Sequence, residues 1–287
     1  MKKIIILLLT FYVTSVLGQQ KTFDYAYMNK KGICVYSVAE KKEYPIVKSG
    51  VDPCISNDGK KLAYTDMNNK GERFIAVINL STKKKTILNT HSNNCYGPVW
   101  SPDGKYIAYN VFDNKKSDWY IAIIDTNNLR PVVLTGKIKG CFMPSWCNNG
   151  KDVATHDMAK LYAFDMTGNI IQQLDLKIFN LSDGTTSADN FIFTTDNKKI
   201  VYGTTVDEPG GDEGPPSAVF VYDMTTKTTK RLSPKGYDTG TLIIKGNAVL
   251  FTGSKVQSPV LNIYSVNLDG TNFKVLFPGC RDISAKD

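Results

Sequence analysis

One ten-residue pattern recurs along this chain and constrains its fold more than any other feature. The clearest copies lie at 55–64, 100–109 and 146–155, and weaker copies lie at 195–202 and 245–251. The turn position of each copy falls at residues 59, 104, 150, 197 and 246, so successive copies are 45, 46, 47 and 49 residues apart. A period of 40–50 residues with several short strands in each unit is typical of a propeller blade.

Each repeat contains signals for four strands. A tight turn such as Asn57-Asp58-Gly59 precedes a Leu-Ala-Tyr or Ile-Ala-Tyr strand, because Gly and Asn tolerate the positive φ that such turns require. Third strands are expected at 74–79, 119–125, 161–165, 219–223 and 263–267, each followed by a polar turn and an outer fourth strand. No stretch of ten or more residues after the first eighteen has a helical period, so the mature chain is predicted to be all-β.

Segments from both ends of the chain complete the ring. Residues 24–27, 33–38 and 44–47 are predicted to be the second, third and fourth strands of a blade that lacks its first strand, which 280–285 would supply. Such closure removes open sheet edges. We therefore predict a six-bladed β-propeller of four-stranded antiparallel blades, closed by strands from both termini, in a single domain over 19–287. Five or seven blades are the alternatives if a weak repeat is counted differently.

Residues 1–18 have the layout of a secretory signal peptide. Lys2 and Lys3 precede an apolar run of about ten residues, and the small residue Gly18 stands at the expected cleavage site. The apolar run is shorter than the roughly 20 residues needed to span a bilayer. We therefore predict an exported protein, periplasmic or secreted to the cell surface, that does not span the membrane; a membrane anchor is the alternative.

Charge and cysteine content narrow the possible partners. The chain has 35 basic and 27 acidic residues, but the basic residues are scattered through turns, so no nucleic-acid partner is predicted. Six cysteines outside the cytosol permit disulfides. Cys95 and Cys141 lie at the same offset before Trp100 and Trp146, so a Cys95–Cys141 disulfide is conceivable, with two free thiols as the alternative.

The segment Trp-Ser-Pro-Asp-Gly-Lys-Tyr-Ile-Ala-Tyr at 100–109 resembles the PD40 (WD40-like) repeat of the TolB-type propellers. The resemblance covers nearly the whole mature chain and is strongest at 95–165. It implies a six-bladed propeller, and it implies an envelope or secreted protein or peptide as the partner. Related blades also occur in prolyl oligopeptidases and in oligogalacturonate lyases, so the motif is more specific for fold than for function.

Catalytic motifs are missing from the sequence. There is no nucleophile elbow, no phosphate-binding loop, no His-Glu-x-x-His and no Cys-x-x-Cys. The two histidines, His91 and His156, limit imidazole chemistry, and a structural role is favoured for both even though Asp157 follows His156. No catalytic residue and no cofactor is predicted.

Three features of the sequence are candidates for binding. An acidic loop at 206–216 is a weak Ca²⁺ candidate, with a solvated loop as the alternative; its carboxylates are Asp207, Glu208, Asp212 and Glu213. Equivalent loops of the first three blades are basic and contain Lys30, Lys31, Lys70, Lys115 and Lys116. Tyr96 and Phe142 are expected near the channel mouth, where aromatic rings can anchor a peptide or stack on a sugar. Filling the top of the core is the alternative role for these two rings.

The leading hypothesis is an exported, non-catalytic binding propeller that holds a protein or peptide at its loop-rich face or channel mouth. Its candidate binding residues are Tyr96, Phe142, Lys139, Arg281, Lys115 and Lys116. The competing hypothesis is a propeller lyase or hydrolase that acts on an acidic glycan. That enzyme would need a cluster such as Tyr96, Arg281, Lys139 and His91 to converge. A third possibility is a structural envelope component without a small ligand.

Overall fold

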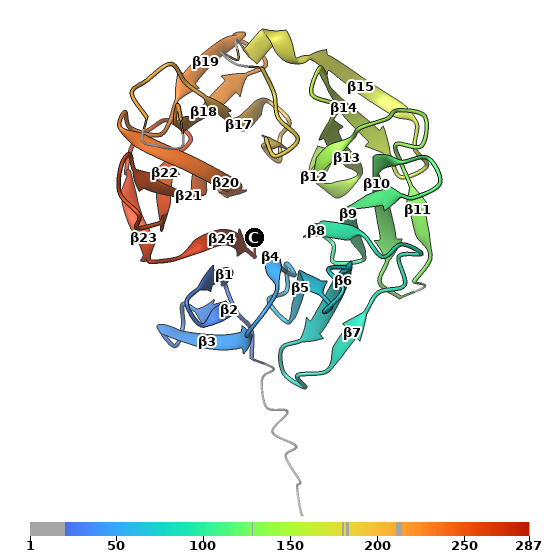
Figure 1. Cartoon of the computed structure of the whole chain (residues 1–287). Helices are drawn as coiled ribbons and strands as arrows, with labels where there is room; N and C mark the ends of the chain where they lie inside the picture. Colours follow the sequence, from blue (N-terminus) through green and yellow to red (C-terminus); the bar gives the residue numbers. More distant parts are fainter. Residues whose placement is uncertain (1–20, 128, 180, 182–183, 211–213, 287) are drawn as a thin grey trace, which may run out of the picture.

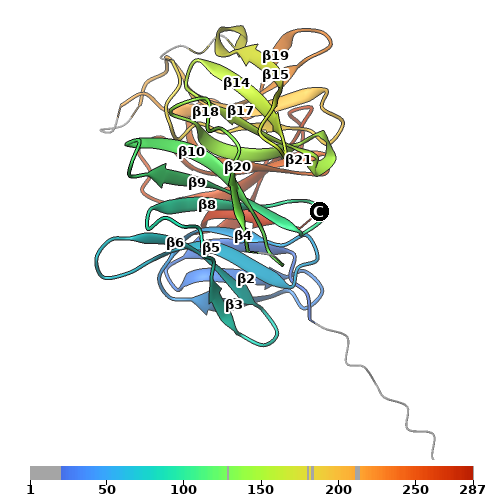
Figure 2. The ribbon, with the colours of Figure 1, turned by 90° about the vertical axis from the view of Figure 1, so that its right-hand side faces the viewer.

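The computed structural model describes residues 21–127, 129–179, 181, 184–210 and 214–286. Its strands form six separate four-stranded sheets arranged as a ring, as Figure 1 shows along the axis and Figure 2 from the side. This confirms the six-bladed propeller of antiparallel four-stranded blades. The predicted signal peptide at 1–18 lies outside the described residues.

The first half of the ring consists of blades 1 to 3. Blade 1 contains β24 (Arg281–Ala285), β1 (Tyr25–Asn29), β2 (Gly32–Ser37) and β3 (Lys42–Val47). Blade 2 contains β4 (Val51–Ile55), β5 (Lys61–Met67), β6 (Arg73–Asn79) and β7 (Lys85–Ile87). Blade 3 contains β8 (Cys95–Trp100), β9 (Tyr106–Asp113), β10 (Asp118–Asp125) and β11 (Pro131–Val133).

The second half consists of blades 4 to 6. Blade 4 contains β12 (Phe142–Cys147), β13 (Asp152–His156), β14 (Lys160–Asp165) and β15 (Ile170–Asp175). Blade 5 contains β16 (Phe191–Phe193), β17 (Lys199–Thr205), β18 (Ser217–Asp223) and β19 (Thr228–Arg231). Blade 6 contains β20 (Tyr237–Lys245), β21 (Ala248–Lys255), β22 (Asn262–Asn267) and β23 (Lys274–Pro278).

Two short 3₁₀ turns, η1 (Asn148–Gly150) and η2 (Leu176–Phe179), are the helical elements of the described ranges. Neither approaches the length and apolarity of a membrane-crossing helix, and no other described segment does so as a helix. We call the end of the disc where second strands join third strands, and where one blade joins the next, the loop face. The opposite end, where first strands join second and third join fourth, is the turn face.

The repeated turn of the sequence has a repeated hydrogen-bond pattern. In blade 3, the Ser101 hydroxyl donates to Asp103 Oδ1 over 2.7 Å, and the same oxygen accepts the Lys105 amide over 3.0 Å. Gly104 closes the turn with a φ of 70°. Blade 2 repeats the bond from Ser56 to Asp58, and blade 5 repeats it from Thr194 to Asp196. Local chemistry therefore explains why the pattern recurs.

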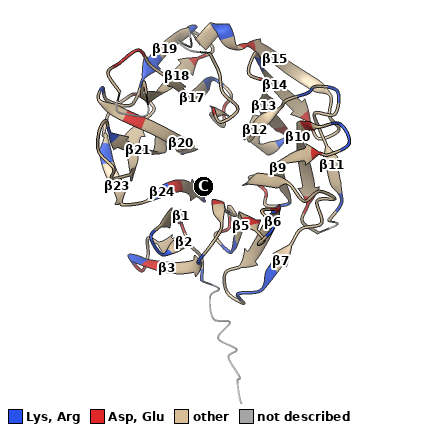
Figure 3. Cartoon of the chain, viewed as in Figure 1, with Lys and Arg blue, Asp and Glu red and all other residues tan. Residues whose placement is uncertain are grey.

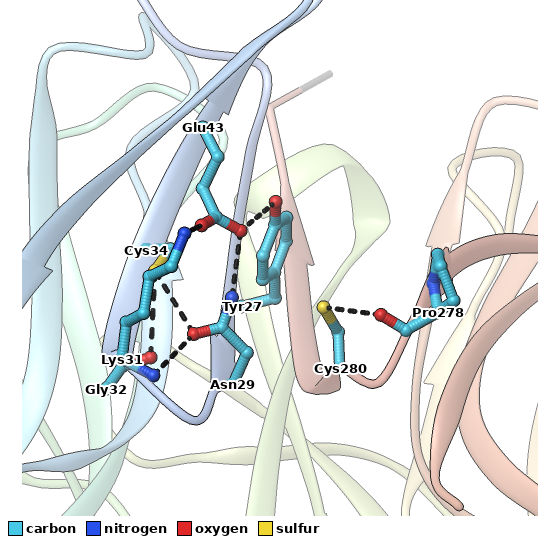
Figure 4. Close-up of polar contacts among 8 residues, drawn as sticks. All are labelled: Tyr27, Asn29, Lys31, Gly32, Cys34, Glu43, Pro278 and Cys280. Atoms are coloured by element: carbon cyan, nitrogen blue, oxygen red, sulfur yellow. Dashed lines mark hydrogen bonds and ion pairs between the residues drawn. The ribbon is translucent and has the colours of Figure 1, made fainter.

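Strands from the two ends of the chain close blade 1. β24 pairs antiparallel with β1, with Tyr25 opposite Ala285. On the other side of β1, the half-buried carboxylate of Glu43 accepts the Tyr27 hydroxyl (2.9 Å), the Asn29 amide (2.8 Å) and the Lys31 ammonium (2.8 Å), as Figure 4 shows. Burial alone would raise the pKa of Glu43, but these three donors lower it below its ordinary value. The network fixes outer strand β3 to β1.

Polar side chains tie neighbouring blades together near the axis. Inner strands β4, β8, β12 and β24 each contain a β-bulge, and one residue of each bulge has a positive φ. Three of these residues donate their amide to a side chain on the second strand of the preceding blade. The pairs are Gly97 with Thr65 Oγ1 (3.0 Å), Met143 with Asn110 Oδ1 (3.0 Å) and Asp282 with Thr252 Oγ1 (2.9 Å).

His156 occupies the position in blade 4 that Thr65 and Asn110 occupy in blades 2 and 3. The ring is fully buried; Nε2 lies 2.9 Å from the Asp189 carbonyl oxygen, and Nδ1 accepts the Met158 amide over 3.2 Å. The Asp189 carbonyl belongs to the connection that leads into blade 5, so the imidazole joins two blades. This agrees with the structural role expected for His156.

Gly203 occupies the same position in blade 5 and provides no such contact. A Cβ at Gly203 would meet Leu242 Cδ2 of blade 6 at 3.6 Å, an ordinary van der Waals distance, and the residue has no left-handed φ. Apolar residues of blades 5 and 6, including Val201, Val219 and Phe251, pack in one cluster across this junction. The junction therefore has room for a small side chain at Gly203.

We expect His156 to make the fold sensitive to acid. Burial lowers the pKa of His156 to about 4. The unfolded chain binds a proton at this ring below about pH 6.5, whereas the folded protein does so only below about pH 4. Stability from this group is therefore present above pH 6.5 and is lost, by about 3 kcal/mol, as the pH falls to 4.

The measurement is urea unfolding of the protein and of His156→Gln at several pH values. Gln keeps a donor near the Nε2 position but does not titrate, so the difference between the two stability curves isolates the imidazole. Parallel curves for the two proteins between pH 7 and pH 4 would show that His156 does not titrate as proposed.

We expect Gly203→Ala to stabilise the protein by about 0.4–1 kcal/mol, because Ala restricts the unfolded chain without straining the folded one. Gly97→Ala is the matched control. Gly97 has a φ of 63°, and its Cβ would lie 2.9 Å from Asn110 Nδ2, so that change should destabilise. Urea midpoints of the two variants check both signs, and a lower midpoint for Gly203→Ala would contradict the account of this junction.

Candidate binding site at the loop face

An arginine and three aromatic side chains gather on the loop face where blades 2 and 3 meet. The Arg73 guanidinium carbon lies 4.6 Å from the centroid of the Tyr96 ring and 5.4 Å from that of Trp119. Trp119 in turn meets Tyr96 and Phe112 edge-on, each at a centroid distance of 5.1 Å. We call these four residues the Arg73 cluster.

The topology of the blades brings the Arg73 cluster together. Arg73 begins β6, Tyr96 lies at the start of β8, Phe112 near the end of β9 and Trp119 near the start of β10, so each stands at the loop-face end of its strand. All four are half-buried. The Arg73 amide donates to the Asn93 carbonyl over 3.0 Å, and its Nε donates to Asn94 Oδ1 over 2.8 Å.

The charge of Arg73 is not neutralised by a carboxylate. Among the described residues, no Asp or Glu forms an ion pair with it, and its Nε donates to the neutral side-chain amide of Asn94. Stacking on two rings stabilises the cation through cation–π interactions. The guanidinium is therefore oriented while its terminal nitrogens stay available to another molecule.

The inner strands place two carboxylates at the channel mouth next to this cluster. Asp52, in the bulge of β4, accepts the Thr65 hydroxyl over 2.7 Å and the Gly97 amide over 3.2 Å. Asp282 lies in the equivalent bulge of β24. Burial raises the pKa of Asp282 and the charge of Asp52 adds to this, whereas Arg281 opposes it. The mouth thus has acidic groups beside the basic cluster.

A hollow of about 630 Å³ lies next to the Arg73 cluster, on its peripheral side. Phe74, Ile87 and the connection 88–93 line it together with Asn114. His91 lies here, exposed and with a φ of 57°. The hollow is open and lined by both polar and apolar groups, so it could extend a contact surface that begins at the cluster.

One of the predicted binding residues contributes its side chain to the Arg73 cluster, and the others do not. Tyr96 belongs to the cluster. Phe142 is only 8% exposed and packs near His156, with the ring centroids 6.2 Å apart, so it fills the core. Lys139 and Lys115 are exposed on loops, whereas Lys116 lies 3.9 Å from Asp113 and over the Tyr120 ring. Arg281 lies 3.7 Å from Asp282 at the mouth.

The cluster required by the glycan-enzyme hypothesis does not form. In the part of the chain that the structure describes, no hydrogen bond, ion pair or ring contact joins any two of Tyr96, Arg281, Lys139 and His91. Tyr96 contacts Arg73 and Trp119 instead, and His91 faces the peripheral hollow. The arrangement provides no acid–base pair around a common point.

The acidic loop holds one of its carboxylates in an ion pair. Glu208 accepts hydrogen bonds from both terminal nitrogens of Arg231, and this pairing lowers the pKa of Glu208. Asp207 lies in the described part of the loop, whereas Asp212 and Glu213 lie outside the described residues. Within the ranges described, no three His, Cys, Asp or Glu side chains group as metal ligands would.

Cys95 and Cys141 are separate buried thiols, so the conceivable disulfide between them is not formed. Cys95 Sγ donates to Thr90 Oγ1 over 3.2 Å, and Cys141 Sγ lies 3.9 Å from the Ile138 carbonyl. The two side chains belong to different apolar clusters, on either side of blade 3. Equal offsets before a repeat place two residues in equivalent blades but do not turn their side chains toward each other.

Sequence reasoning missed Arg73, Phe112 and Trp119. Their signal was available in part, because each lies beside a loop that joins a second strand to a third. Selecting aromatic and arginine residues at those strand ends, rather than only those before the inner strands, would have found them.

Comparisons with known proteins place this fold. No family model matches the chain. The Tol-Pal system protein TolB of Alcanivorax borkumensis is 29% identical over 100 residues, which are 35% of this chain and 22% of that protein. An oligogalacturonate lyase in complex with manganese is a more distant structural neighbour, 15% identical with a TM-score of 0.52 over 90% of this chain and 72% of that one.

Two TolB structures resemble the whole ring. TolB from Acinetobacter baumannii is 17% identical with a TM-score of 0.66, over 92% of this chain and 66% of that chain, so this chain spans slightly less than two thirds of its length. A putative TolB from Agrobacterium tumefaciens is 15% identical with a TM-score of 0.62, over 92% of this chain and 94% of that chain. This chain therefore has the six-bladed β-propeller fold of the TolB type.

Proposed function

We propose that this protein is an exported, non-catalytic binding propeller that holds a protein or peptide segment on its loop face, beside the channel mouth. The observation that carries the proposal is the Arg73 cluster. Arg, Tyr and Trp are the residue types that most often dominate binding energy at protein interfaces. Here all three occur in one contact group, half-buried and fixed by their neighbours.

The chemistry of the cluster indicates what the partner presents. An oriented guanidinium without a carboxylate favours a partner carboxylate, which it can bind through two hydrogen bonds. The rings of Tyr96, Phe112 and Trp119 favour an apolar or aromatic side chain next to that carboxylate. The expected ligand is therefore a peptide segment, or a protein loop, that places an acidic residue beside an apolar one.

Two further observations support this role. The fold is shared with TolB, which is named as a protein of the Tol-Pal system. Residues 1–18 have the layout of an export signal. An envelope or secreted protein is accordingly the proposed partner, in the periplasm or at the cell surface.

The test is cross-linking and co-purification from the native cell envelope, followed by affinity measurement with the purified partner. We expect Arg73→Gln and Trp119→Ala each to weaken binding about 30-fold or more, the effect of a residue that contributes 2 kcal/mol or more. Arg130→Gln is the matched control, because Arg130 is exposed on the turn face and has no ion pair among the described residues. Thermal melting confirms that each variant is folded.

Tryptophan fluorescence provides an independent readout. Trp100 and Trp146 are buried, whereas Trp119 is half-buried on the loop face, so partner binding should change the emission of Trp119 alone. The change should vanish in Trp119→Phe. Equal retention of a partner by the protein and by both cluster variants would exclude this site, and the lack of any partner in the native envelope would overturn the binding role.

A further inference from the structure

A group of lysines covers the turn face of blades 1 and 2, opposite the face that contains the Arg73 cluster. We call it the lysine patch; it consists of Lys21, Lys41, Lys42, Lys60, Lys83 and Lys84. Lys21 precedes β1, Lys41 and Lys42 lie where β3 begins, Lys60 lies in the turn before β5, and the last two precede β7. Figure 3 shows basic residues at the ends of β3 and β7.

Contacts between the two blades make the lysine patch continuous. The Phe23 amide donates to the Gly59 carbonyl over 3.0 Å, which joins the segment after Lys21 to the turn that contains Lys60. The ammonium groups of Lys21 and Lys42 lie 3.8 Å and 5.2 Å from the centroid of one ring, that of Tyr44. Burial lowers the pKa of Lys83, and the charge of Lys21 lowers it further, so the two lysines lie close enough to repel each other.

Few carboxylates neutralise the lysine patch. Glu40 pairs with Lys21 over 2.8 Å, and Asp24 pairs with Lys286 over 3.0 Å. Asp58 accepts the Ser56 hydroxyl and the Lys60 amide within its own turn. In the described part of the chain, no ion pair involves the remaining five lysines of the patch.

The chain enters the propeller at this patch. The first described residue is Lys21, and the twenty residues before it contain Lys2, Lys3 and the apolar run at 4–13. A segment of that composition interacts with a membrane during export. If it is kept, it tethers this face to the bilayer. If it is removed after Gly18, two residues remain before Lys21, which belongs to the patch.

We propose that the lysine patch docks the protein on an anionic lipid surface. Flexible lysines distributed over a face, rather than converging on a pocket, suit a diffuse layer of headgroups, and each contributes about a fivefold increase in binding near such a surface. Docking in this way leaves the loop face pointing away from the lipid and free to bind its partner. The inference therefore adds to the proposed function and does not depend on it.

The test is co-sedimentation with lipid vesicles of the protein purified from cells that export it. One set of vesicles is phosphatidylcholine with about 30% phosphatidylglycerol, and the other is pure phosphatidylcholine. The variant replaces Lys41, Lys42, Lys83 and Lys84 by Gln. The matched control replaces Lys30, Lys48, Lys70 and Lys137 by Gln, which removes the same charge from exposed lysines of the loop face. Mass spectrometry establishes the amino terminus of each preparation.

We expect binding to the anionic vesicles alone, weakening as salt rises from about 0.1 to about 0.5 M because exposed charges become screened. The patch variant should bind at least 100-fold more weakly, at about fivefold for each lysine removed, while the control variant binds like the unaltered protein. Equal loss in both variants, equal binding to neutral vesicles, or no binding at low salt would each overturn the proposal.

Two additional measurements distinguish lipid docking from polyanion binding and from the proposed loop-face function. Binding of a soluble polyphosphate by the patch, without binding of anionic vesicles, would assign it to a polyanion instead of a lipid surface and reject the proposal. The patch variant should still retain the loop-face partner, and Arg73→Gln should still bind vesicles. Loss of one activity without the other therefore shows which of the two proposals fails.

Discussion

Side chains that reach from one blade into the next hold this propeller as one body, and the loop-face site depends on them. The Thr65 hydroxyl of blade 2 binds Asp52 and also receives the Gly97 amide of blade 3. Gly97 directly follows Tyr96, so this contact sets where the Tyr96 ring stands against Arg73. A surface patch assembled from two blades is rigid only if the blades cannot slide, and a buried polar contact of this kind fixes their register.

The fold could be predicted from sequence because its signals are local. The turn between the first and second strands binds its own backbone within five residues, so similar residues recur there in blades 2, 3 and 5. The inner strand at 280–285 could be predicted from the strand count, since a blade that begins with its second strand requires a first one from elsewhere. The spacing of the repeats therefore indicated five blades, and the strand signals near both ends of the chain indicated the sixth.

The site was less accessible to sequence reasoning because the repeat does not indicate which side chains from different strands become a contact group. Arg73 and Trp119 occupy equivalent positions on the third strands of blades 2 and 3, whereas Tyr96 lies on the first strand of blade 3. Only the packing of the two blades brings these side chains together. Phe142 of blade 4 is equivalent to Tyr96 of blade 3, because each residue directly follows a cysteine and precedes the bulge. Phe142 nevertheless faces His156 inside the core. Repeat equivalence predicts backbone position well and side-chain surroundings poorly, because the neighbouring blade differs at each step.

The closure of blade 1 has a consequence for the order in which the molecule is made. Of the strands that the structure describes, β1 is synthesised first and its hydrogen-bonding partner β24 last. Until that last strand emerges, β1 keeps an unpaired edge, and blades 1 and 6 keep uncovered apolar faces. The β1 edge is therefore exposed to pairing with other chains until β24 is made, and removal of β24 would leave the ring open at blade 1.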